Sequence, residues 1–321
     1  MTTTLEYLWV DNNQNPRSKV KIEKISPINP LPIWNFDGSS TGQADMSQTE
    51  VLLKPVRTFS HPFIENALLV LCECDDPTTG NPHISNSRHI ALQKFKNSQD
   101  IWFGLEQEFF FTGTKEVDYQ KPQGEYYCGN NNSPAIERKI MEEFTDIVIG
   151  MKIPLSGHNQ EVAPSQWEYQ IGPATAIDSP DFMVVCKFIM TRLCEKYEIG
   201  ITFEPKYLSG DWNGSGCHIN ISTEKTRNDT ELKETIKIIE NIKKDHSNWL
   251  GKYDGKNNNL RLTGKHETSN PLEFTYGIGT RNTSVRIPTQ VWKDGKGYFE
   301  DRRPGSLLDY YLSTSKYCDY L

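Results

Sequence analysis

The stretch from Trp102 to Phe111, WFGLEQEFFF, places two glutamates, Glu106 and Glu108, in an otherwise aromatic and aliphatic run. Successive side chains of a strand alternate between its faces, so both carboxylates would point to the same side. Two like charges so close on a partly buried segment are unfavourable unless a cation lies between them. An isolated pair of this kind usually just meets water, but the pattern recurs further along the chain. The stretch therefore predicts a strand that carries part of a cation site.

Length, charge and cysteine content narrow the class of protein. The 321 residues can bury a large core in one big domain or two unequal ones. A net charge of −7, with acidic and basic residues interspersed, argues against nucleic acid as the main partner. The sequence has no apolar run that could span a membrane, and it begins with neither a signal peptide nor a transit sequence. Seven cysteines without regular spacing suit a reducing compartment, so we expect a cytoplasmic protein.

Residues 1–80 are expected to form a small domain of strands, and residues 81–321 a larger one, with the boundary in DDPTTGNPH (75–83). Short strands joined by Pro- and Asn-rich turns are predicted at 5–11, 19–25, 50–55 and 67–75. No strong helical period interrupts them.

The segment WNFDGSSTGQ (34–43) lies between these strands and is rich in glycine and small polar residues, which predicts a loop. Local turn hydrogen bonds are the ordinary explanation of its Asp37 and Ser40. The aromatic residues at its start indicate that the loop is held in place, and the residues alone give no further purpose.

Helices alternate with strands in the larger part of the chain. One helix is expected at 86–97 and another from about Pro134, each with apolar residues on one side. The clearest helix follows Ser179, the expected cap, and its apolar stripe runs until Gly200 stops it. Strands followed by mixed helices and strands predict the α+β class.

Three later segments place polar side chains on one face of a predicted strand, as the opening stretch does. In chain order these faces hold Gln166, Glu168 and Gln170; His218, Asn220 and Ser222; and Glu300 and Arg302. Glu161 precedes the first of these segments by a few residues.

Carboxylates and one imidazole dominate the collected faces: Glu106, Glu108, Glu161, Glu168, Glu300 and His218. Hard oxygen ligands suit two or three divalent cations such as Mg²⁺ or Mn²⁺, and the cysteines supply no set of zinc ligands. The complementary basic groups are Arg261, Arg281, Arg286 and Arg302. Guanidinium groups bind carboxylate and phosphate oxygens in pairs, so metals beside arginines indicate phosphoryl transfer. A network of structural ion pairs is the alternative.

The common nucleotide-binding and hydrolase motifs are missing from the sequence. It contains no GxxxxGK[ST], no complete GxGxxG and no GxSxG. If ATP is used, it must bind through metals, arginines and strand surfaces.

Seven motifs, in this order, closely resemble the glutamine synthetase family of the eukaryotic type: WNFDGSSTGQ, WFGLEQE, YYCG, QWEYQIGP, GDWNGSGCHIN, RLTGKHETSN and GKGYFEDRRP. The resemblance covers roughly residues 5–313. It implies a small N-terminal β-grasp domain and a larger catalytic domain with a curved antiparallel sheet, a half-barrel, backed by helices. It also implies a homodecamer of two pentameric rings with active sites between neighbouring subunits.

The resemblance assigns a role to each polar residue of the motifs. One metal would be held by Glu108, Glu161 and Glu168. The metal nearer the ATP phosphates would be held by Glu106, His218 and Glu300. The glutamate substrate would be bound by Arg261, Asn213, Gly214, Arg281 and Arg302, with Arg302 at the γ-carboxylate. ATP would be bound by Trp102, Glu106, Glu168, Asn220, Ser222, Arg281, Arg286 and Tyr298. Ammonium would be captured by Tyr127 and Glu267 with Asp37 and Ser40 of a neighbouring subunit.

The implied reaction joins L-glutamate and ammonium into L-glutamine, with ATP as co-substrate and γ-glutamyl phosphate as intermediate. A γ-glutamyl ligase for another amine and a non-catalytic structural relative are the alternatives. The complete ammonium set favours ammonia, and the six metal ligands argue against a non-catalytic relative. The chain departs from the family pattern at Thr289, where many relatives carry a basic residue, in a shorter 109–125 loop, and in its short N-terminal and C-terminal segments.

Overall fold

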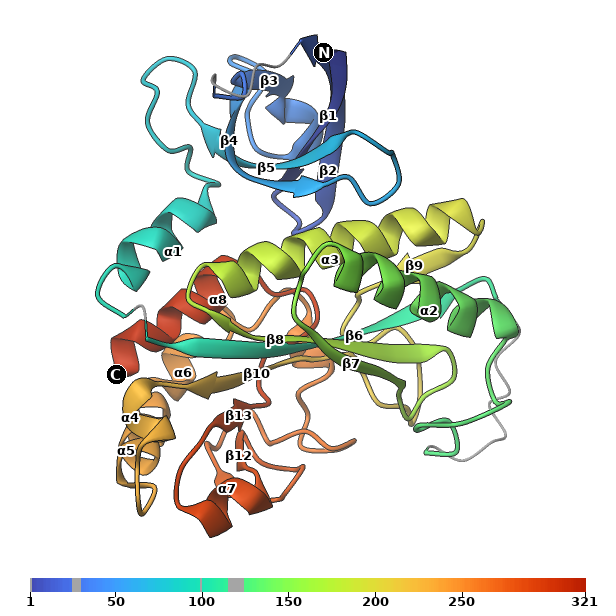
Figure 1. Cartoon of the computed structure of the whole chain (residues 1–321). Coiled ribbons are helices and arrows are strands. Elements are labelled where there is room, and N and C mark those ends of the chain that lie inside the picture. The colour runs from blue at the N-terminus through green and yellow to red at the C-terminus, as the bar shows by residue number, and fades with distance from the viewer. Residues whose placement is uncertain (1, 25–29, 99, 115–123) are drawn as a thin grey trace.

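The computed structural model describes residues 2–24, 30–98, 100–114 and 124–321 (Figure 1). Two sheets and the helices between and around them make up this part of the chain. The predicted α+β class is confirmed, because one of the sheets curls into a half-barrel that helices back. The central part of the predicted 109–125 loop lies at residues 115–123, outside the described residues.

The smaller sheet has five strands in the order β2-β1-β5-β4-β3. Its strands are β1 (Thr2–Val10), β2 (Pro16–Lys24), β3 (Trp34–Asp37), β4 (Glu50–Ser60) and β5 (Leu68–Asp75). β1 pairs in parallel with β5, and the other neighbours are antiparallel. The four predicted strands are confirmed, except that residue 25 lies outside the described residues.

The prediction of a loop over residues 34–43 was wrong in its first part. Residues 34–37 form β3, which pairs with β4, and Gly38–Thr41 form a 3₁₀ turn. The reason is the aromatic side chain of Phe36, which is buried in the core of the small sheet. The small polar residues that suggested a loop begin only at Gly38.

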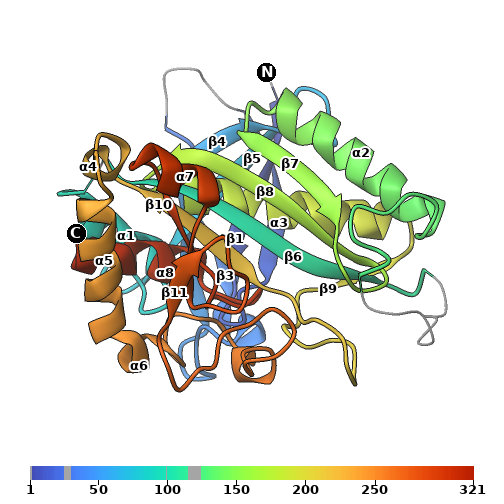
Figure 2. The same cartoon turned by 90° about the horizontal axis from the view of Figure 1, so that it is seen from below.

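The larger sheet has eight strands, seven of them in the order β11-β12-β13-β10-β6-β8-β7, with β9 paired to β6. Its strands are β6 (Trp102–Thr112), β7 (Leu155–Gln160), β8 (Gln166–Thr175), β9 (Gly200–Thr202), β10 (Cys217–Ser222), β11 (Tyr276–Ile278), β12 (Val285–Ile287) and β13 (Phe299–Asp301). All pairs are antiparallel except β11 with β12. The stretch from Trp102 to Phe111 therefore lies in β6, a central strand of this sheet, as Figure 2 shows from below.

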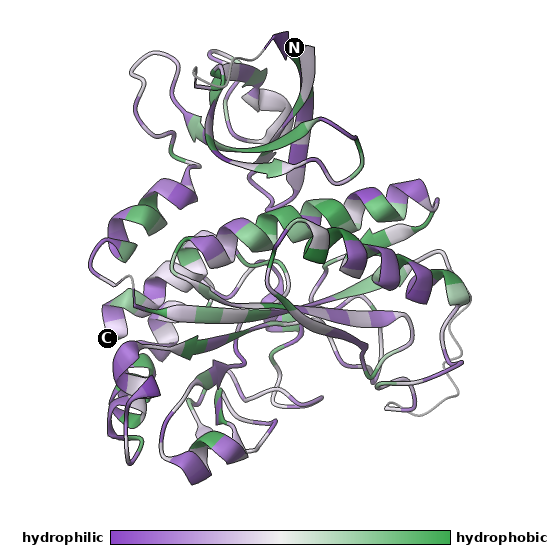
Figure 3. Cartoon of the chain, in the orientation of Figure 1, coloured by the Kyte–Doolittle hydropathy of each residue, from purple (hydrophilic) through white to green (hydrophobic). Residues whose placement is uncertain are grey.

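Two long helices, α2 (Ala135–Gly150) and α3 (Asp178–Lys196), cover one face of the larger sheet (Figure 1). The other helices are α1 (Ser87–Phe95), α4 (Glu224–Arg227), α5 (Lys233–Lys244), α6 (His246–Trp249), α7 (Thr289–Asp294) and α8 (Tyr310–Lys316), with 3₁₀ turns at Asn258–Leu260 and Tyr317–Tyr320. Apolar residues gather along the middle of α3, between the two sheets (Figure 3). The main core fills the space between these helices and the outward side of β6 and β8.

The predicted bounds of α3 were wrong at both ends. The helix starts at Asp178, so Ser179 lies in its first turn with a buried hydroxyl rather than capping it. It ends at Lys196, before Gly200. The left-handed conformation that ends such a helix is adopted nearby by Glu198, with φ 57°. Glycine was expected in that role, and Gly200 instead begins β9.

Polar contacts join the small sheet to α3. The Arg192 side chain donates to Glu6 at 3.0 Å, and Lys187 donates to the Gln14 carbonyl at 2.8 Å. The division at residue 80 stays a prediction. Within the described residues, no helix combines the length and apolar character needed to cross a membrane. All seven cysteines are free thiols.

Candidate active site

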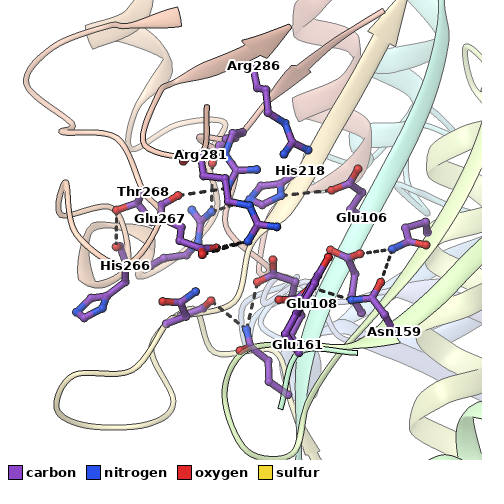
Figure 4. A pocket seen from close by; sticks show the side chains of 18 residues that line it. Glu106, Glu108, Asn159, Glu161, His218, His266, Glu267, Thr268, Arg281 and Arg286 are labelled. Atoms are coloured by element: carbon purple, nitrogen blue, oxygen red, sulfur yellow. Dashed lines mark hydrogen bonds and ion pairs between the residues drawn. The ribbon is translucent and has the colours of Figure 1, made fainter. Parts of the chain in front are cut away.

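The inner, concave face of the larger sheet carries Glu106 and Glu108 of strand β6. Strand β6 lies between β10 and β8, so Glu106 is opposite His218 and Glu108 is opposite Glu168. Both glutamates point to the same side, as the alternation predicted (Figure 4). Three neighbouring strands thus bring four potential metal ligands together.

Two groups of side chains place their potential ligand atoms within 4.8 Å of one another. The first is Glu106, His218 and Glu300, and the second is Glu108, Glu168 and His218. The first group has the same members as the predicted set nearer the phosphates. In the second, His218 takes the place predicted for Glu161, which lines the same cavity without joining this cluster.

Three of the carboxylates lie in surroundings that disfavour their ionised form, because burial and neighbouring carboxylates outweigh the arginines nearby. Burial and the neighbouring Glu161 raise the pKa of Glu108 to about 8. Burial likewise raises the pKa of Glu161 to about 7, and burial with Glu106 raises that of Glu168 well above its ordinary value. Within the described residues, none of the three forms an ion pair with lysine or arginine. Such a cluster is stable in its ionised form only when a cation binds between the carboxylates.

Glu108 is nevertheless held in a fixed position. Its Oε2 accepts hydrogen bonds from the Gly216 backbone N–H at 2.7 Å and from Gln166 Nε2 at 3.3 Å. Residue 216 must be glycine, because a Cβ there would lie 2.6 Å from Arg261 Nη2 and 2.9 Å from His218 Nε2. The backbone therefore approaches the site as closely as a side chain would.

The predicted arginines surround the same cavity. Arg261 is buried, and its Nη2 donates to His218 Nε2 at 3.0 Å. Burial and Arg302 lower the pKa of His218, which keeps the imidazole neutral, the form in which it binds metals. Arg302 and Arg286 pair with Glu300. Guanidinium groups and carboxylates therefore alternate around the cavity.

The cavity has a volume of about 210 Å³ and collects most of the predicted site. Its predicted lining residues are Glu106, Glu108, Tyr127, Glu161, Glu168, Asn213, Gly214, His218, Arg261, Glu267, Arg281, Arg286 and Arg302. Glu300 is fully buried beside them.

A second cavity of about 440 Å³ adjoins the first and shares Glu106 and Gln170 with it. The residues predicted to enclose a nucleotide line it: Trp102, Asn220, Ser222 and Tyr298. Asn220 links the two cavities, because its Nδ2 donates to Glu106 Oε1 at 2.8 Å. The apolar residues that line this cavity include Leu105, Ile171 and Pro173.

Asp37 and Ser40 do not join the other predicted site residues within this chain. Both are exposed on the small sheet, and neither lines the two cavities. The Asp37 carboxylate accepts hydrogen bonds from the Ser39 backbone N–H at 3.0 Å and the Ser39 hydroxyl at 2.6 Å. Inside one subunit the loop thus makes the local turn contacts that its composition suggested.

Several residues that line the two cavities were not among the predicted site residues. In the first cavity these are Asn159, Gln166, Gln170, His266 and Thr268, and in the second Ser156 and Arg227 are among them. Gln166 and Gln170 share the face of Glu168, so alternation could have assigned them. Arg227 comes from the four-residue helix α4 and lies 3.9 Å over the Trp102 ring, a contact without a sequence signal.

Comparisons with known proteins agree with the geometry. A family profile described as glutamine synthetase, catalytic domain, matches residues 86–237. The glutamine synthetase of Saccharomyces cerevisiae is 41% identical over 326 residues, covering 98% of this chain and 88% of that protein. Those of Emericella nidulans and Schizosaccharomyces pombe are each 41% identical over 321 residues, covering 96% of this chain and 89% of those proteins.

Proposed function

The chain belongs to the glutamine synthetase family, and we propose that its two adjoining cavities convert L-glutamate, ammonium and ATP into L-glutamine. The observation that carries this proposal is the shared wall at Glu106. It joins an acidic, arginine-lined cavity to a larger one whose lining includes the aromatic residues Trp102 and Tyr298. A nucleotide in the larger cavity would direct its phosphates into the smaller one.

We propose that the acidic cluster binds two or three Mg²⁺ or Mn²⁺ ions. Carboxylate oxygens and a neutral imidazole are suitable donors for these ions, and the raised pKa values indicate that burial and neighbouring carboxylates disfavour ionisation unless a cation binds. Glu106, His218 and Glu300 would hold one ion, and Glu108, Glu161 and Glu168 another. When bound, such ions neutralise the phosphate oxygens and the charge that develops during transfer.

The arginines would orient the two reacting substrates. Arg261, with Asn213 and Gly214, would bind the α-carboxylate of glutamate, since a buried guanidinium offers paired donors. Arg302 would hold the γ-carboxylate, and Arg281 with Arg286 would bind phosphate oxygens. Arg281 pairs with Glu267, and Arg286 and Arg302 pair with Glu300. An anionic substrate would compete with these carboxylates for the same guanidinium groups.

The reaction proceeds by two substitutions. A γ-carboxylate oxygen of glutamate attacks the γ-phosphorus of ATP, and ADP leaves, giving γ-glutamyl phosphate. Ammonia then attacks the acyl carbon and phosphate leaves, giving the amide. Ammonium must first lose a proton, so an ionised carboxylate that can accept this proton is required beside the acyl carbon. Glu267, at the mouth of the cavity beside Tyr127, is the proposed acceptor.

We propose that Asp37 and Ser40 complete the ammonium site of a neighbouring subunit, in a homodecamer of two pentameric rings. The exposure of both residues and their distance from this chain's own cavities support the proposal. The seven free cysteines support the cytoplasm as the location.

Product formation from glutamate, ATP and Mg²⁺ tests the reaction itself. With ammonium as the amine, glutamine should form at least about 100-fold faster than γ-glutamyl methylamide forms from methylamine, because a charged pocket for ammonium excludes the added methyl group. Glu168→Gln serves as the inactive control. A preference for the larger amine would establish the alternative γ-glutamyl ligase.

Mixed oligomers test the sharing of the site between subunits. Asp37→Ala and Glu161→Ala subunits should each be nearly inactive alone, because one lacks the ammonium loop and the other a metal ligand. Co-expression should recover part of the activity, since some interfaces pair an intact loop with an intact metal site. No recovery, in oligomers shown by mass spectrometry to contain both subunits, would mean that the loop does not act across the interface.

A further inference from the structure

A small apolar cluster lies at one end of the concave face, separate from the main core. It consists of Phe110, Tyr126, Ala163, Leu208 and Trp212, each of them almost completely buried. Phe110 follows Glu108 by two residues on β6, so it lies on the same face as the acidic cluster. The cluster thus continues the floor of the smaller cavity in apolar side chains.

The cluster anchors loops that carry residues of the smaller cavity. Tyr126 precedes Tyr127, and Trp212 precedes Asn213, and both Tyr127 and Asn213 line the cavity. The rings of Tyr126 and Trp212 meet edge to face at 6.3 Å between centroids and are 4% and 6% exposed. A movement of either loop would therefore break a buried aromatic contact.

The Trp212 loop also contacts the segment that carries Glu267. Asp211 Oδ1 lies 3.2 Å from His266 Nε2, and His266 precedes Glu267 in the chain. Both His266 and Glu267 have left-handed backbone conformations, with φ 53° and 62°, so they form a sharp turn at the cavity mouth. The position of this turn is coupled to the loop that holds Trp212.

Arg281 closes a ring of contacts around the mouth of the cavity. Its Nη1 pairs with both Glu267 oxygens at 3.0 and 3.1 Å, as Figure 4 shows, and its guanidinium lies 5.5 Å from the centre of the Tyr127 ring. The ring therefore runs from Tyr127 through Arg281 to Glu267. It returns through Asp211 and Trp212.

We propose that Trp212 is a positioning residue that sets the spacing between Tyr127 and Glu267, and with it the affinity for ammonium. This inference rests on the proposed function, which places ammonium between those two residues. The Asp211 side chain is 99% exposed, so its contact with His266 can hold the turn only while the Trp212 loop is itself held in place. Trp212 is the member of the loop that is buried, and its indole is therefore the anchor.

The test compares Michaelis constants for the three substrates in the oligomeric enzyme. Trp212→Leu should raise the KM for ammonium about tenfold, with the KM for ATP changed less than about twofold, because the nucleotide cavity lies at the opposite end of β6. Trp212→Phe should restore most of the ammonium affinity, since it keeps an aromatic ring against Tyr126. Trp102→Leu is the matched control and should show the reverse pattern, a raised KM for ATP alone.

Further variants distinguish a positioning role of Trp212 from a general loss of stability. Tyr126→Leu removes the same contact from the other loop and should give the same selective rise. In a Glu267→Gln background, Trp212→Leu should add little to the KM for ammonium, because both changes act on one site. Equal rises in the KM values for ATP and ammonium, or no rescue by Trp212→Phe, would overturn the positioning role.

Glu267→Gln alone separates this inference from the proposed function. An unchanged KM for ammonium in that variant would contradict the proposed ammonium site itself. A raised value in Glu267→Gln together with an unchanged value in Trp212→Leu and Tyr126→Leu would contradict only the role of Trp212.

Discussion

The carboxylate of Asp301 on β13 and the carboxylates of Glu108, Glu161 and Glu168 on the concave side of the larger sheet have opposite surroundings. Asp301 points into the core, where Arg303 Nη2 donates to it at 2.6 Å, Arg303 Nε donates at 3.0 Å and the Tyr317 hydroxyl donates at 2.9 Å. Asp301 and Arg303 are both fully buried. Every oxygen of this carboxylate therefore has a partner of opposite polarity.

On the concave face, Glu300 pairs with Arg286 and Arg302, but Glu108, Glu161 and Glu168 form no direct ion pair with lysine or arginine in the described part of the chain. Burial and mutual repulsion raise the pKa values of Glu108, Glu161 and Glu168, whereas Asp301 raises the pKa of Arg303 above its ordinary value even though burial alone would lower it. The first arrangement stabilises the fold, and the second is unfavourable until a ligand binds. Buried carboxylates with strongly raised pKa values are typical of functional sites.

Breaking the complete pair should have the largest effect. Arg303→Met should lower the free energy of unfolding by about 3–5 kcal/mol, because Asp301 would remain as a buried charge without a partner. Urea denaturation followed by circular dichroism measures this. Adding Asp301→Leu should recover most of the loss, and a single variant as stable as the wild type would contradict the structural role of the pair.

Removing a carboxylate from the acidic cluster should instead reduce activity strongly and leave stability unchanged or higher. Glu168→Gln should reduce glutamine formation by about 10²–10³-fold or more, the range for loss of one electrostatic group at an active site. The metal-free variant should be at least as stable as the wild type, because one repelling charge is gone. Activity and urea denaturation on the same preparation check both halves. A variant that loses stability as Arg303→Met does would place Glu168 with the structural pairs.

Arg261 is buried like Arg303, but it lines the cavity, so its substitution should affect substrate binding. Arg261→Lys keeps the charge and loses the planar fork, so the KM for glutamate should rise about tenfold or more while the KM for ATP changes little. Steady-state kinetics with each substrate varied in turn give the answer. If ATP is affected and glutamate is not, the roles of the arginines are wrongly assigned.

Lys187 is buried and forms no ion pair with a carboxylate among the residues that the structure describes, so its substitution should give the smallest effect. Burial lowers its pKa to about 8, below the unfolded value, so the folded state favours the neutral amine. The stability contribution is therefore full above the unfolded pKa and is lost as the pH falls through about 8. Lys187→Met should remove this dependence and gain about 1–2 kcal/mol at pH 7, less the hydrogen bond to Gln14. Thermal unfolding from pH 7 to 10 measures it.

The rule of alternation explains how much of the site the sequence predicted. Glu106, Glu108 and Glu168 line one cavity because each is on the concave side of a strand whose neighbours are also in the site. Asn159 was missed because the pairing of β7 with β8 shifts register between Leu155 and Gly157, which no sequence pattern shows.

Contacts between distant segments account for the other errors. Arg227 reaches the nucleotide cavity from a four-residue helix, so its position depends on tertiary packing rather than on local pattern. Residues 34–37 were mistaken for loop because the burial of Phe36 outweighs the polar residues that follow it. Local composition correctly predicted the turn hydrogen bonds of Asp37 within one subunit. It carries no information about contacts with a neighbouring subunit.

If the acidic cluster binds divalent cations as we propose, the stability of the protein should depend on both pH and Mg²⁺. In the metal-free protein the folded-state pKa values of Glu108, about 8, and Glu161, about 7, exceed their unfolded values. The folded state therefore binds more protons, and this contribution to the free energy of unfolding is present at low pH and is lost as the pH rises to about 8.

The measurement is the free energy of unfolding of the wild type and of Glu161→Gln between pH 5 and pH 8, each with and without Mg²⁺. The metal-free wild type should lose stability relative to Glu161→Gln as the pH rises. Mg²⁺ should reverse this loss in the wild type, most strongly at the highest pH, because the ion binds the ionised carboxylates. Curves that run parallel across this range and do not respond to Mg²⁺ would contradict the claim.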